Sequence, residues 1–343
     1  MTADFAKLLG RLMSPEPIDA ADVRAGFDAL LAGAWTPVQV AGFAVALRTR
    51  GETAEVILAA AQAMRSAMAV VEHAFPVVAD TCGTGGDGAQ TLNLSSGAAV
   101  IVAACGVPVA KHGNRSISSR CGSADVLEAM GIPIDVPTSR QREVLEDAGI
   151  AFLFAPAHHP ALKHAGQARR ELGVRTIFNA LGPLANPARA THQLVGVYDD
   201  ALRPVAALAL GGLGVKRAWV VRSEDGLDEI SPSAPTRVSE LTAEGTVREI
   251  AVAPEDFGLP RVPVATLAGG PAEMNAQALT AILTGQAHPA RDAVILNAAA
   301  ALAVATSDGL RECAARARAA IEGGAARDKF DRWKRAARQA RGS

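Results

Sequence analysis

The sequence has 343 residues with 34 basic and 35 acidic side chains, a formal net charge of −1, 49% hydrophobic residues and 4% aromatic residues. This composition is typical of a folded globular protein, and it argues against intrinsic disorder and against a general nucleic-acid binder. The longest nearly uncharged apolar stretch, residues 293–305, covers 13 residues, whereas a membrane-spanning helix needs roughly 20. We therefore expect two domains, or one lobe with a large addition, and no membrane segment.

The beginning of the chain and its cysteines bear on the cellular compartment. Asp4 stands where a secretory signal would be basic, and no long apolar run follows it. The cysteines show neither a C-x-x-C pair nor metal-ligand spacing with histidines; they are Cys82, Cys105, Cys121 and Cys313. We expect reduced thiols and a cytoplasmic protein.

The first 72 residues predict helices only. Apolar side chains recur at helical spacing in two groups, Phe5, Leu8, Leu9 and Leu12, then Val23, Phe27, Leu30 and Leu31. Thr36 before Pro37 predicts the start of a third helix, because threonine caps helices and proline suits their first turn. Gly51 ends that helix, and residues 54–71 predict a fourth. We expect a small helical lobe whose first helices keep apolar surface for packing on another surface.

The hydrophobic period changes at residues 75–80, a β-branched run that leads into a glycine-rich loop. Strand candidates then follow at 107–111, 152–155, 193–198 and 217–222, separated by helical segments near 95–105, 122–130, 139–148 and 201–213. This alternation predicts a mainly parallel sheet covered by helices on both faces.

Four further segments complete the chain. Residues 160–173 are polar and helical and could fold back on the helical lobe, and residues 236–252 have hairpin character. Helices follow from Pro271 onward. For the basic, alanine-rich tail 314–343 we favour a solvated terminal helix over an interaction patch.

The glycine loop 83–88, with the letters GTGGDG, precedes a helix that starts near Ser95. Glycines let backbone N–H groups approach a phosphate closely, and the helix N-terminus adds unpaired donors. The letters match G-x-G-x-x-G, but the next strand ends in Lys111 instead of the acid that a dinucleotide ribose needs, and no P-loop lysine follows. A plain tight turn is the alternative. The polar side chains behind the loop, more than helix capping needs, favour an anion site: Thr91, Asn93, Ser95 and Ser96.

Two more polar stretches follow strand ends. Residues 111–125 hold cations, hydroxyls and Asn114 with Ile117 as the one apolar anchor, at the carboxyl end of a strand where open α/β sheets bind ligands. In residues 223–231, Asp228 and Glu229 are adjacent. On a regular strand they would point to opposite faces, so both serve one site only if the chain turns or two ions are held. Beside a polyphosphate they suggest Mg²⁺, and otherwise they are solvated surface.

A helix between the lobes carries Arg169 and Arg170. Either guanidinium could bind the carboxylate of an acidic substrate, and an ion pair with Glu171 or with the second lobe is the alternative. His158 and His159 have no acidic or cysteine partner at helical spacing, which argues against a metal role.

The motifs GTGGDG, NLSS, KHGNRSISS with GSAD, RRELG, TIFNALGPLANPA and GLDEIS resemble, in this order, those of the anthranilate phosphoribosyltransferase family. The resemblance covers nearly the whole chain. It implies an α/β fold of nucleoside-phosphorylase-like architecture, with a helical domain over 1–72, a returning helical segment near 160–185, and a large α/β domain over 73–343. It also implies Mg²⁺, a homodimer through the helical domains, and transfer of the phosphoribosyl group of phosphoribosyl pyrophosphate to the amine of anthranilate in tryptophan biosynthesis.

The resemblance also assigns site residues. To phosphoribosyl pyrophosphate it assigns Gly83, Gly86, Asp87, Thr91, Asn93, Leu94, Ser95, Ser96, Lys111, His112, Gly113, Asn114, Arg115, Ser116, Ile117, Ser118, Ser119 and Ser123. To anthranilate it assigns Gly83, Asn114 and Arg169, and to Mg²⁺ it assigns Ser95, Asp228 and Glu229. Four positions depart from the family pattern: Ser96 replaces threonine, Arg120-Cys121 replaces Lys-Ser, and His158 replaces tyrosine near the anthranilate entrance.

An arylamine is neutral at pH 7, so the implied reaction needs no strong base. We expect no acid–base dyad, and His112 is the one possible local proton relay. A pyrimidine nucleoside phosphorylase is the alternative enzyme, disfavoured by the Arg169 helix and the intact KHGNR letters. A silent relative that binds nucleic acid is disfavoured by a pI below neutrality and by the Asp228-Glu229 pair.

Overall fold

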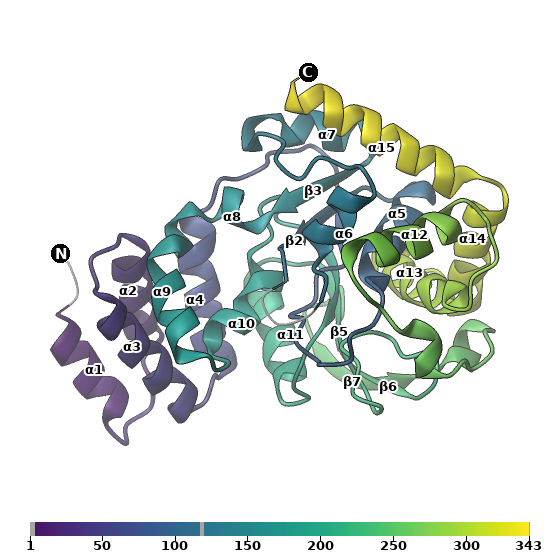
Figure 1. The fold of residues 1–343 in the computed structure, drawn as a ribbon. Coiled ribbons are helices and arrows are strands. Elements are labelled where there is room, and N and C mark those ends of the chain that lie inside the picture. The colour runs from purple at the N-terminus through teal and green to yellow at the C-terminus, as the bar shows by residue number, and fades with distance from the viewer. Residues whose placement is uncertain (1–3, 117–119, 343) are drawn as a thin grey trace.

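The computed structural model describes residues 4–116 and 120–342, which form a helical lobe at one end and a helix-covered sheet at the other (Figure 1). The lobe contains α1 (Phe5–Met13), α2 (Ala20–Leu31), α3 (Pro37–Arg50), α4 (Ala54–Ser66), α9 (Lys163–Leu172) and α10 (Ile177–Leu181). The short helix α8 (Ala155–His158) leads back from the sheet toward this lobe (Figure 1).

Local capping explains where the first helices begin. The Asp4 carboxylate accepts hydrogen bonds from the N–H groups that open α1, and Thr36 and Gln39 form a capping box at the start of α3. The fourth predicted helix is shorter than expected, because α4 ends at Ser66. Beyond it the Ala69 N–H donates to the His158 carbonyl at 2.8 Å, so the backbone there pairs with another segment instead of continuing the helix.

The first helices bury part of their predicted apolar stripes. Leu8 and Leu12 lie inside the lobe, where α1 packs on α3. The large apolar side chains that remain exposed on these two helices are Met13, Val38 and Val45. The first helices therefore do leave apolar surface, and it lies outside the predicted stripes.

The sheet has seven strands in the order β3-β2-β1-β4-β5-β6-β7. They are β1 (Ala79–Asp80), β2 (Val109–Gly113), β3 (Ile150–Phe154), β4 (His192–Gly196), β5 (Arg217–Ser223), β6 (Thr236–Leu241) and β7 (Val247–Val252). The first five pair in parallel, and β6 and β7 add an antiparallel hairpin. This confirms the predicted α/β class and the hairpin at 236–252, whereas the strand predicted at 75–80 is reduced to its last two residues.

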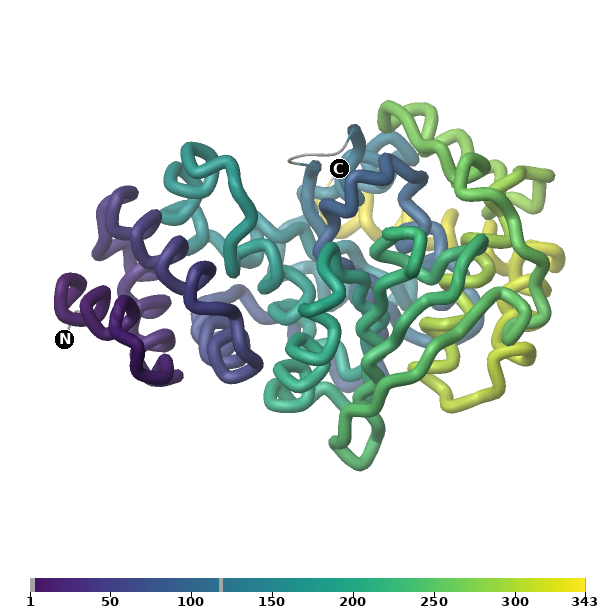
Figure 2. The backbone as a smooth tube through the Cα atoms, turned by 90° about the horizontal axis from the view of Figure 1, so that it is seen from below, coloured from purple at the N-terminus to yellow at the C-terminus, as the bar shows by residue number. Residues whose placement is uncertain are grey.

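Helices cover this sheet, seen from below in Figure 2. They are α5 (Leu94–Ala104), α6 (Ser123–Ala129), α7 (Gln141–Ala148), α11 (Leu202–Gly212), α12 (Ala272–Leu283), α13 (Arg291–Thr306), α14 (Leu310–Glu322) and α15 (Ala325–Arg341). The apolar stretch 293–305 is a buried helix, α13, packed on α5 at Gly97. No helix in the two described ranges has the length and apolar character to span a bilayer.

The basic tail is not a single solvated helix. Gly323 and Gly324 divide it into α14 and α15, and one side of α15 is buried against α5 and α7, with Trp333 fully inside. On the outer side, Arg332 pairs with Asp147 at 3.0 Å. The prediction of a helix was right, but the aromatic residues at helical spacing make this helix part of the core.

Two hydrophobic cores fill the molecule. One holds α1 to α4 together with α9 and α10 and continues onto α11 and one side of β4 and β5, through residues such as Val195 and Val220. The other fills the opposite side of the sheet, where Leu194 and Val221 point. This alternation follows from the two-residue period of a strand. As predicted, residues 160–173 fold back on the helical lobe, against α2 and α3.

Candidate active site

The polar motifs gather at the carboxyl ends of the parallel strands. β1 lies between β2 and β4, so the strand order reverses there, which is where open α/β sheets bind ligands. The glycine loop follows β1, the KHGN letters end β2, and the acidic turn follows β5.

The glycine loop packs tightly on β4. The Thr84 N–H donates to the Gly196 carbonyl at 2.8 Å, and a Cβ on Gly83 would stand 3.0 Å from that oxygen. Gly86 has φ 81°, a left-handed conformation that favours glycine. Glycine is therefore favoured at position 83 by close packing and at position 86 by backbone conformation.

The chain turns after β5, which brings both adjacent acids to the glycine loop and the start of α5. The Ser95 N–H donates to Glu229 Oε1 at 3.3 Å, and the Asp228 N–H donates to Asp87 Oδ2 at 3.4 Å. The Gly85 N–H also donates to the Asp228 carboxylate. Of the two arrangements that sequence left open, the chain adopts the turn.

These carboxylates form a half-buried cluster of negative charge. Burial raises the pKa of Asp228, and the neighbouring Asp87 carboxylate raises it further. Burial and Asp228 likewise raise the pKa of Glu229. The cation beside them is Lys111, itself buried, whose Nζ lies 3.3 Å from Thr81 Oγ1 and 3.4 Å from Ser95 Oγ.

A divalent cation fits this charge arrangement, because two adjacent, half-buried carboxylates repel each other until a positive charge offsets them. The described residues contain no group of three or more His, Cys, Asp or Glu side chains arranged as a complete metal cage. Mg²⁺ does not require one, since it is commonly bound through one or two carboxylates together with phosphate oxygens and water.

The stretch after β2 is fastened to α6. Arg115 forms ion pairs with Asp125 at 2.8 Å and Glu128 at 2.9 Å, so its guanidinium is already neutralised. Asp125, the acid of GSAD, also accepts hydrogen bonds from the N–H groups of Ser116 and Gly122. Asn114 Oδ1 accepts from the Arg115 N–H, and Ser123 Oγ donates to the Asn114 carbonyl. The predicted site residues Ile117, Ser118 and Ser119 lie outside the described residues.

The polar series behind the glycine loop is divided between site and scaffold. Asn93 joins two other segments, donating to the Cys121 carbonyl at 3.1 Å and accepting from Asn275 at 3.1 Å. Leu94 is fully buried in the core, and Thr91 forms a β-bridge with Ala268. The Ser96 hydroxyl is buried and has no hydrogen-bond partner among the described residues.

Two imidazole rings lie on the side of the site that faces the helical lobe. His112 Nδ1 donates to the Gly182 carbonyl at 3.0 Å, which leaves Nε2 as the acceptor. Its ring centre lies 5.2 Å from that of His159, and burial holds the pKa of His112 well below its usual value. Neither Nε2 has a hydrogen-bond partner in the described chain. The neighbouring His158 donates from Nδ1 to the Ala69 carbonyl, where the chain passes between the helical lobe and the sheet.

Arg169 extends from α9, and its guanidinium carbon lies 5.4 Å from the centre of the Phe178 ring. Burial lowers the pKa of this guanidinium. Among the described residues, Arg169 forms no ion pair with Glu171, which accepts a hydrogen bond from Gln167 at 2.9 Å.

Sequence reasoning missed two residues that shape the site. A Cβ on Gly196 would stand 1.5 Å from the Asp228 carbonyl oxygen, so only glycine allows the acidic turn to reach the glycine loop. A glycine inside a strand pattern was the available signal. Arg175 donates to the Gly86 carbonyl and lies 4.6 Å from the centre of the Tyr198 ring. No local pattern marks it.

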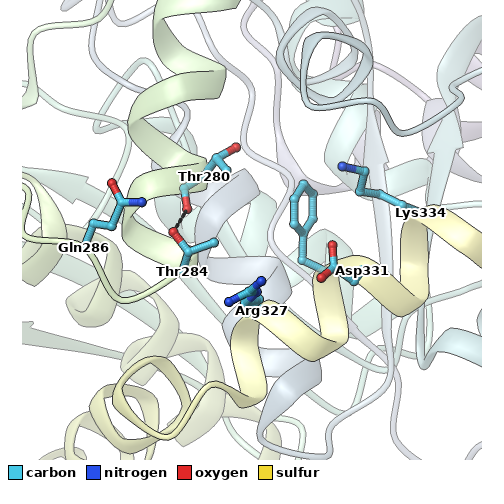
Figure 3. Close-up of a pocket in the computed structure, with 7 residues that line it drawn as sticks. Thr280, Thr284, Gln286, Arg327, Asp331 and Lys334 are labelled. Carbon is cyan, nitrogen blue, oxygen red and sulfur yellow. Dashed lines mark hydrogen bonds between the residues drawn. The ribbon is translucent and has the colours of Figure 1, made fainter.

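A separate hollow of about 360 Å³ lies between α12 and α15 (Figure 3). It is lined by Thr280, Thr284, Gln286, Arg327, Phe330, Asp331 and Lys334. None of these residues belongs to the motifs, so the strand ends, and not this hollow, form the candidate site.

Comparison with known proteins decides the family. A model of the glycosyl transferase family, helical bundle domain, matches residues 6–68, and one of the glycosyl transferase family, a/b domain, matches residues 76–327. Over 323 residues the chain is 49% identical to the anthranilate phosphoribosyltransferase of Myxococcus xanthus, covering 94% of this chain and 96% of that protein. The chain belongs to the anthranilate phosphoribosyltransferase family.

Solved structures of this family have the same fold. The anthranilate phosphoribosyltransferase of Thermus thermophilus superposes with a TM-score of 0.90 at 41% identity, covering 96% of this chain and 99% of that one. The Saccharomyces cerevisiae structure in complex with PRPP and Mg has a TM-score of 0.90 at 26% identity over 98% of both chains. Another structure from that yeast is in complex with 4-fluoroanthranilate, with a TM-score of 0.89 at 26% identity, again over 98% of both chains.

Proposed function

We propose that this chain transfers the phosphoribosyl group of 5-phosphoribosyl 1-pyrophosphate to the amine of anthranilate, giving N-(5-phosphoribosyl)anthranilate and pyrophosphate, in tryptophan biosynthesis. The observation that carries the proposal is the contact between the Ser95 N–H and Glu229, with Lys111 beside Ser95. It joins an anion-binding helix start, a buried cation and an acidic pair at one point, which is what a metal-bound pyrophosphate requires.

The pyrophosphate and ribosyl phosphate are assigned to the glycine loop, the start of α5 and the end of β2. The Thr84 and Gly85 N–H groups are already engaged, so the donors would come from the other N–H groups of the loop, and the N-terminus of α5 adds its dipole. Lys111, whose Nζ lies beside Ser95 Oγ, provides a positive charge. The polar residues from Thr91 to Ser96 and from His112 to Ser123 complete the proposed binding surface.

Ser95, Asp228 and Glu229 are the residues that would hold Mg²⁺. The closely spaced carboxylates favour this assignment, because desolvation and neighbouring carboxylates raise the pKa of both acids and a bound cation would offset these effects. When bound, the cation supplies charge stabilisation for the departing pyrophosphate. Asp87 hydrogen-bonds the Asp228 N–H and so orients the acidic turn.

Anthranilate is assigned to the space between the sheet and the helical lobe. The Arg169 guanidinium, free of acidic partners in the described chain, would bind the carboxylate with two parallel hydrogen bonds. Gly83 and Asn114 would line the other side. Since Arg169 belongs to α9 and Gly83 follows β1, the two bodies would hold opposite ends of the nucleophile.

The protein's main task is to orient the amine and to stabilise the leaving group. An arylamine carries a free electron pair at neutral pH, so attack on C1 needs position more than base strength. Donors that meet growing negative charge on pyrophosphate lower the barrier to departure, through a transition state that resembles an oxocarbenium ion. Neutral His112 presents an acceptor Nε2 and would take the excess proton of the amine.

We further propose a cytoplasmic homodimer. Exposed Met13, Val38 and Val45 on α1 and α3 support contact through the helical lobe, and the four free cysteines support a reducing compartment. The two cores support division of the chain into a helical domain, 1–72 with the segment near 160–185, and an α/β domain over 73–343.

The direct test is purified protein with both substrates and Mg²⁺, following the loss of anthranilate fluorescence. We expect loss only when all three are present, and pyrophosphate should form in equal amount. A pyrimidine nucleoside with inorganic phosphate is the matched test of the phosphorylase alternative. Turnover of that pair without turnover of anthranilate would reject the proposal.

A further inference from the structure

β1 and β2 separate at the end of the sheet that carries the site. The Ala79 N–H donates to the Pro108 carbonyl at 2.8 Å, and the register of the two strands is Ala79 opposite Val109. Because alternate residues of a parallel strand face the same neighbour, the next ladder bonds would use the Ala110 carbonyl and the His112 N–H. Both groups bond to side chains instead.

Two buried side chains take these ladder positions. The Ala110 carbonyl accepts from Asn186 Nδ2 at 2.8 Å, and the His112 N–H donates to Asp80 Oδ1 at 3.2 Å. Asn186 Nδ2 also donates to Asp80 Oδ2 at 2.7 Å, so the two inserted side chains are bonded to each other. Both side chains are fully buried. We call this pair the Asp80–Asn186 wedge.

The wedge connects three segments of the site. Asp80 lies three residues before the glycine loop, and its carboxylate also accepts from the Cys82 N–H. Asn186 comes from the PLANPA letters, where its Oδ1 accepts from the Ala188 N–H at 2.8 Å. His112 follows Lys111 on β2. A continuous ladder would draw Thr81, a partner of Lys111 Nζ, onto the β2 backbone.

The wedge also places the Asp80 carboxylate in the protein interior, where desolvation disfavours a charge. Burial raises the pKa of Asp80 to about 6, and the neighbouring Lys111 ammonium opposes that rise. A buried carboxylate is retained only where a cation and donors offset its desolvation. Asp80 therefore offsets the positive charge of Lys111 from the sheet, and Glu229 does so from the acidic turn.

We propose that Asp80, together with Asn186, is a positioning residue for phosphoribosyl pyrophosphate, because the wedge fixes the separation between the glycine loop and the Lys111-His112 pair. The inference rests on the proposed function, since it concerns the same site. Both residues act through the groups of the glycine loop and of β2 that would contact the substrate.

The test compares Asp80→Asn and Asn186→Ala with Glu240→Gln. The control removes a buried carboxylate from β6 of the same sheet, where Glu240 pairs with Arg248 at 2.6 Å. For both wedge variants we expect KM for phosphoribosyl pyrophosphate to rise about tenfold or more, with KM for anthranilate within about twofold. The control should change neither KM.

Hydrogen exchange gives a readout that does not need turnover. In Asp80→Asn, amides of residues 81–88 and 110–116 should exchange faster than in the parent, while those of β5 keep their rates. If the parent protein shows no transfer activity, the proposed function fails, and exchange still tests the wedge. Unchanged exchange at these two segments, or a fall in kcat with both KM values unchanged, would overturn the proposal. Failure of both variants to fold would also overturn it, because the pair would then serve folding and not positioning.

Discussion

The backbone of Asp228 passes directly against Gly196, so close that a Cβ there would stand 1.5 Å from the Asp228 carbonyl oxygen. Gly196→Ala should therefore push the acidic turn away from the glycine loop. We expect kcat/KM to fall by roughly 100-fold, as for a displacement of about 1 Å at a reacting centre. Steady-state rates at saturating Mg²⁺ measure this effect. Gly309→Ala, whose added Cβ would meet no atom within 4 Å, is the control and should keep full activity.

Arg169→Ala should raise KM for anthranilate much more than KM for phosphoribosyl pyrophosphate. It removes a partner of the benzoate carboxylate only, and a charged hydrogen bond of about 1.5 to 3 kcal/mol corresponds to roughly 10- to 150-fold. Arg170→Ala, an exposed arginine on the same helix, should leave both KM values unchanged. Equal changes in both KM values for Arg169→Ala would show a structural role.

Asp228→Asn and Glu229→Gln should raise the Mg²⁺ concentration needed for the half-maximal rate. Each variant keeps the shape of the turn but removes one charge from a cation ligand, so excess Mg²⁺ should restore part of the activity. Glu224→Gln changes an exposed acid at the start of the same loop, and its Mg²⁺ dependence should match the parent. A loss that no Mg²⁺ concentration recovers, with one limb of the pH–rate profile missing, would indicate proton transfer.

The buried histidines predict loss of stability in mild acid. Burial lowers the pKa of His159 from 6.5 to about 4, and it also lowers the pKa of His158. Their stabilising contribution is complete above pH 6.5 and is lost as pH falls toward 4, because the unfolded chain takes up protons first. At ~1.4 kcal/mol for each pH unit, His159 alone accounts for about 3 kcal/mol.

Urea unfolding at pH 7.0, 5.5 and 4.5 measures this dependence. The free energy of unfolding should fall with pH in the parent and fall less steeply in His159→Gln. His288→Gln, at the start of α13 and outside the site, is the control and should follow the parent. Identical slopes for all three proteins would mean that His159 does not carry the effect.

The proposed dimer predicts a specific set of disruptive surface changes. Val38 is 81% exposed and Val45, seven residues along α3, is 42% exposed, so the two share a helix face. Val38→Glu with Val45→Glu should convert a dimer into a monomer in sedimentation at micromolar concentration without lowering Tm. Leu208→Glu, an exposed leucine on α11, should remain dimeric. A parent protein that sediments as a monomer would remove this proposal.

The sequence predicted that charged residues after the strands would gather at one edge of the sheet, because charge can be read from residue type. Lys111, Asp228 and Glu229 are charged groups after strand ends, and parallel strands bring such ends to one edge. The same reasoning could not find Gly196, because its importance comes from a backbone contact with Asp228 that no short pattern encodes. Asp80 was equally hidden, since its partner Asn186 is 106 residues away.

Element boundaries failed for similar physical reasons. The run at 75–80 has strand composition, but only Ala79 and Asp80 find strand partners, because the Val78 N–H donates to the Thr191 hydroxyl instead of to a neighbouring strand. The basic, alanine-rich composition of the tail 314–343 predicted a solvated helix. Trp333 and Phe330 lie on one side of α15 and bury it, which average charge cannot reveal.

The helical lobe is assembled from two distant parts of the chain. Ala165 and Ala168 of α9 sit in the same hydrophobic core as Phe27 and Val56 of the first four helices. The lobe is therefore not a module that recombination can move by exchanging the N-terminus alone. A chimera joined near residue 72 would pair foreign helices with the native α9, and its interface would have to be redesigned on both partners before either substrate could be held in register.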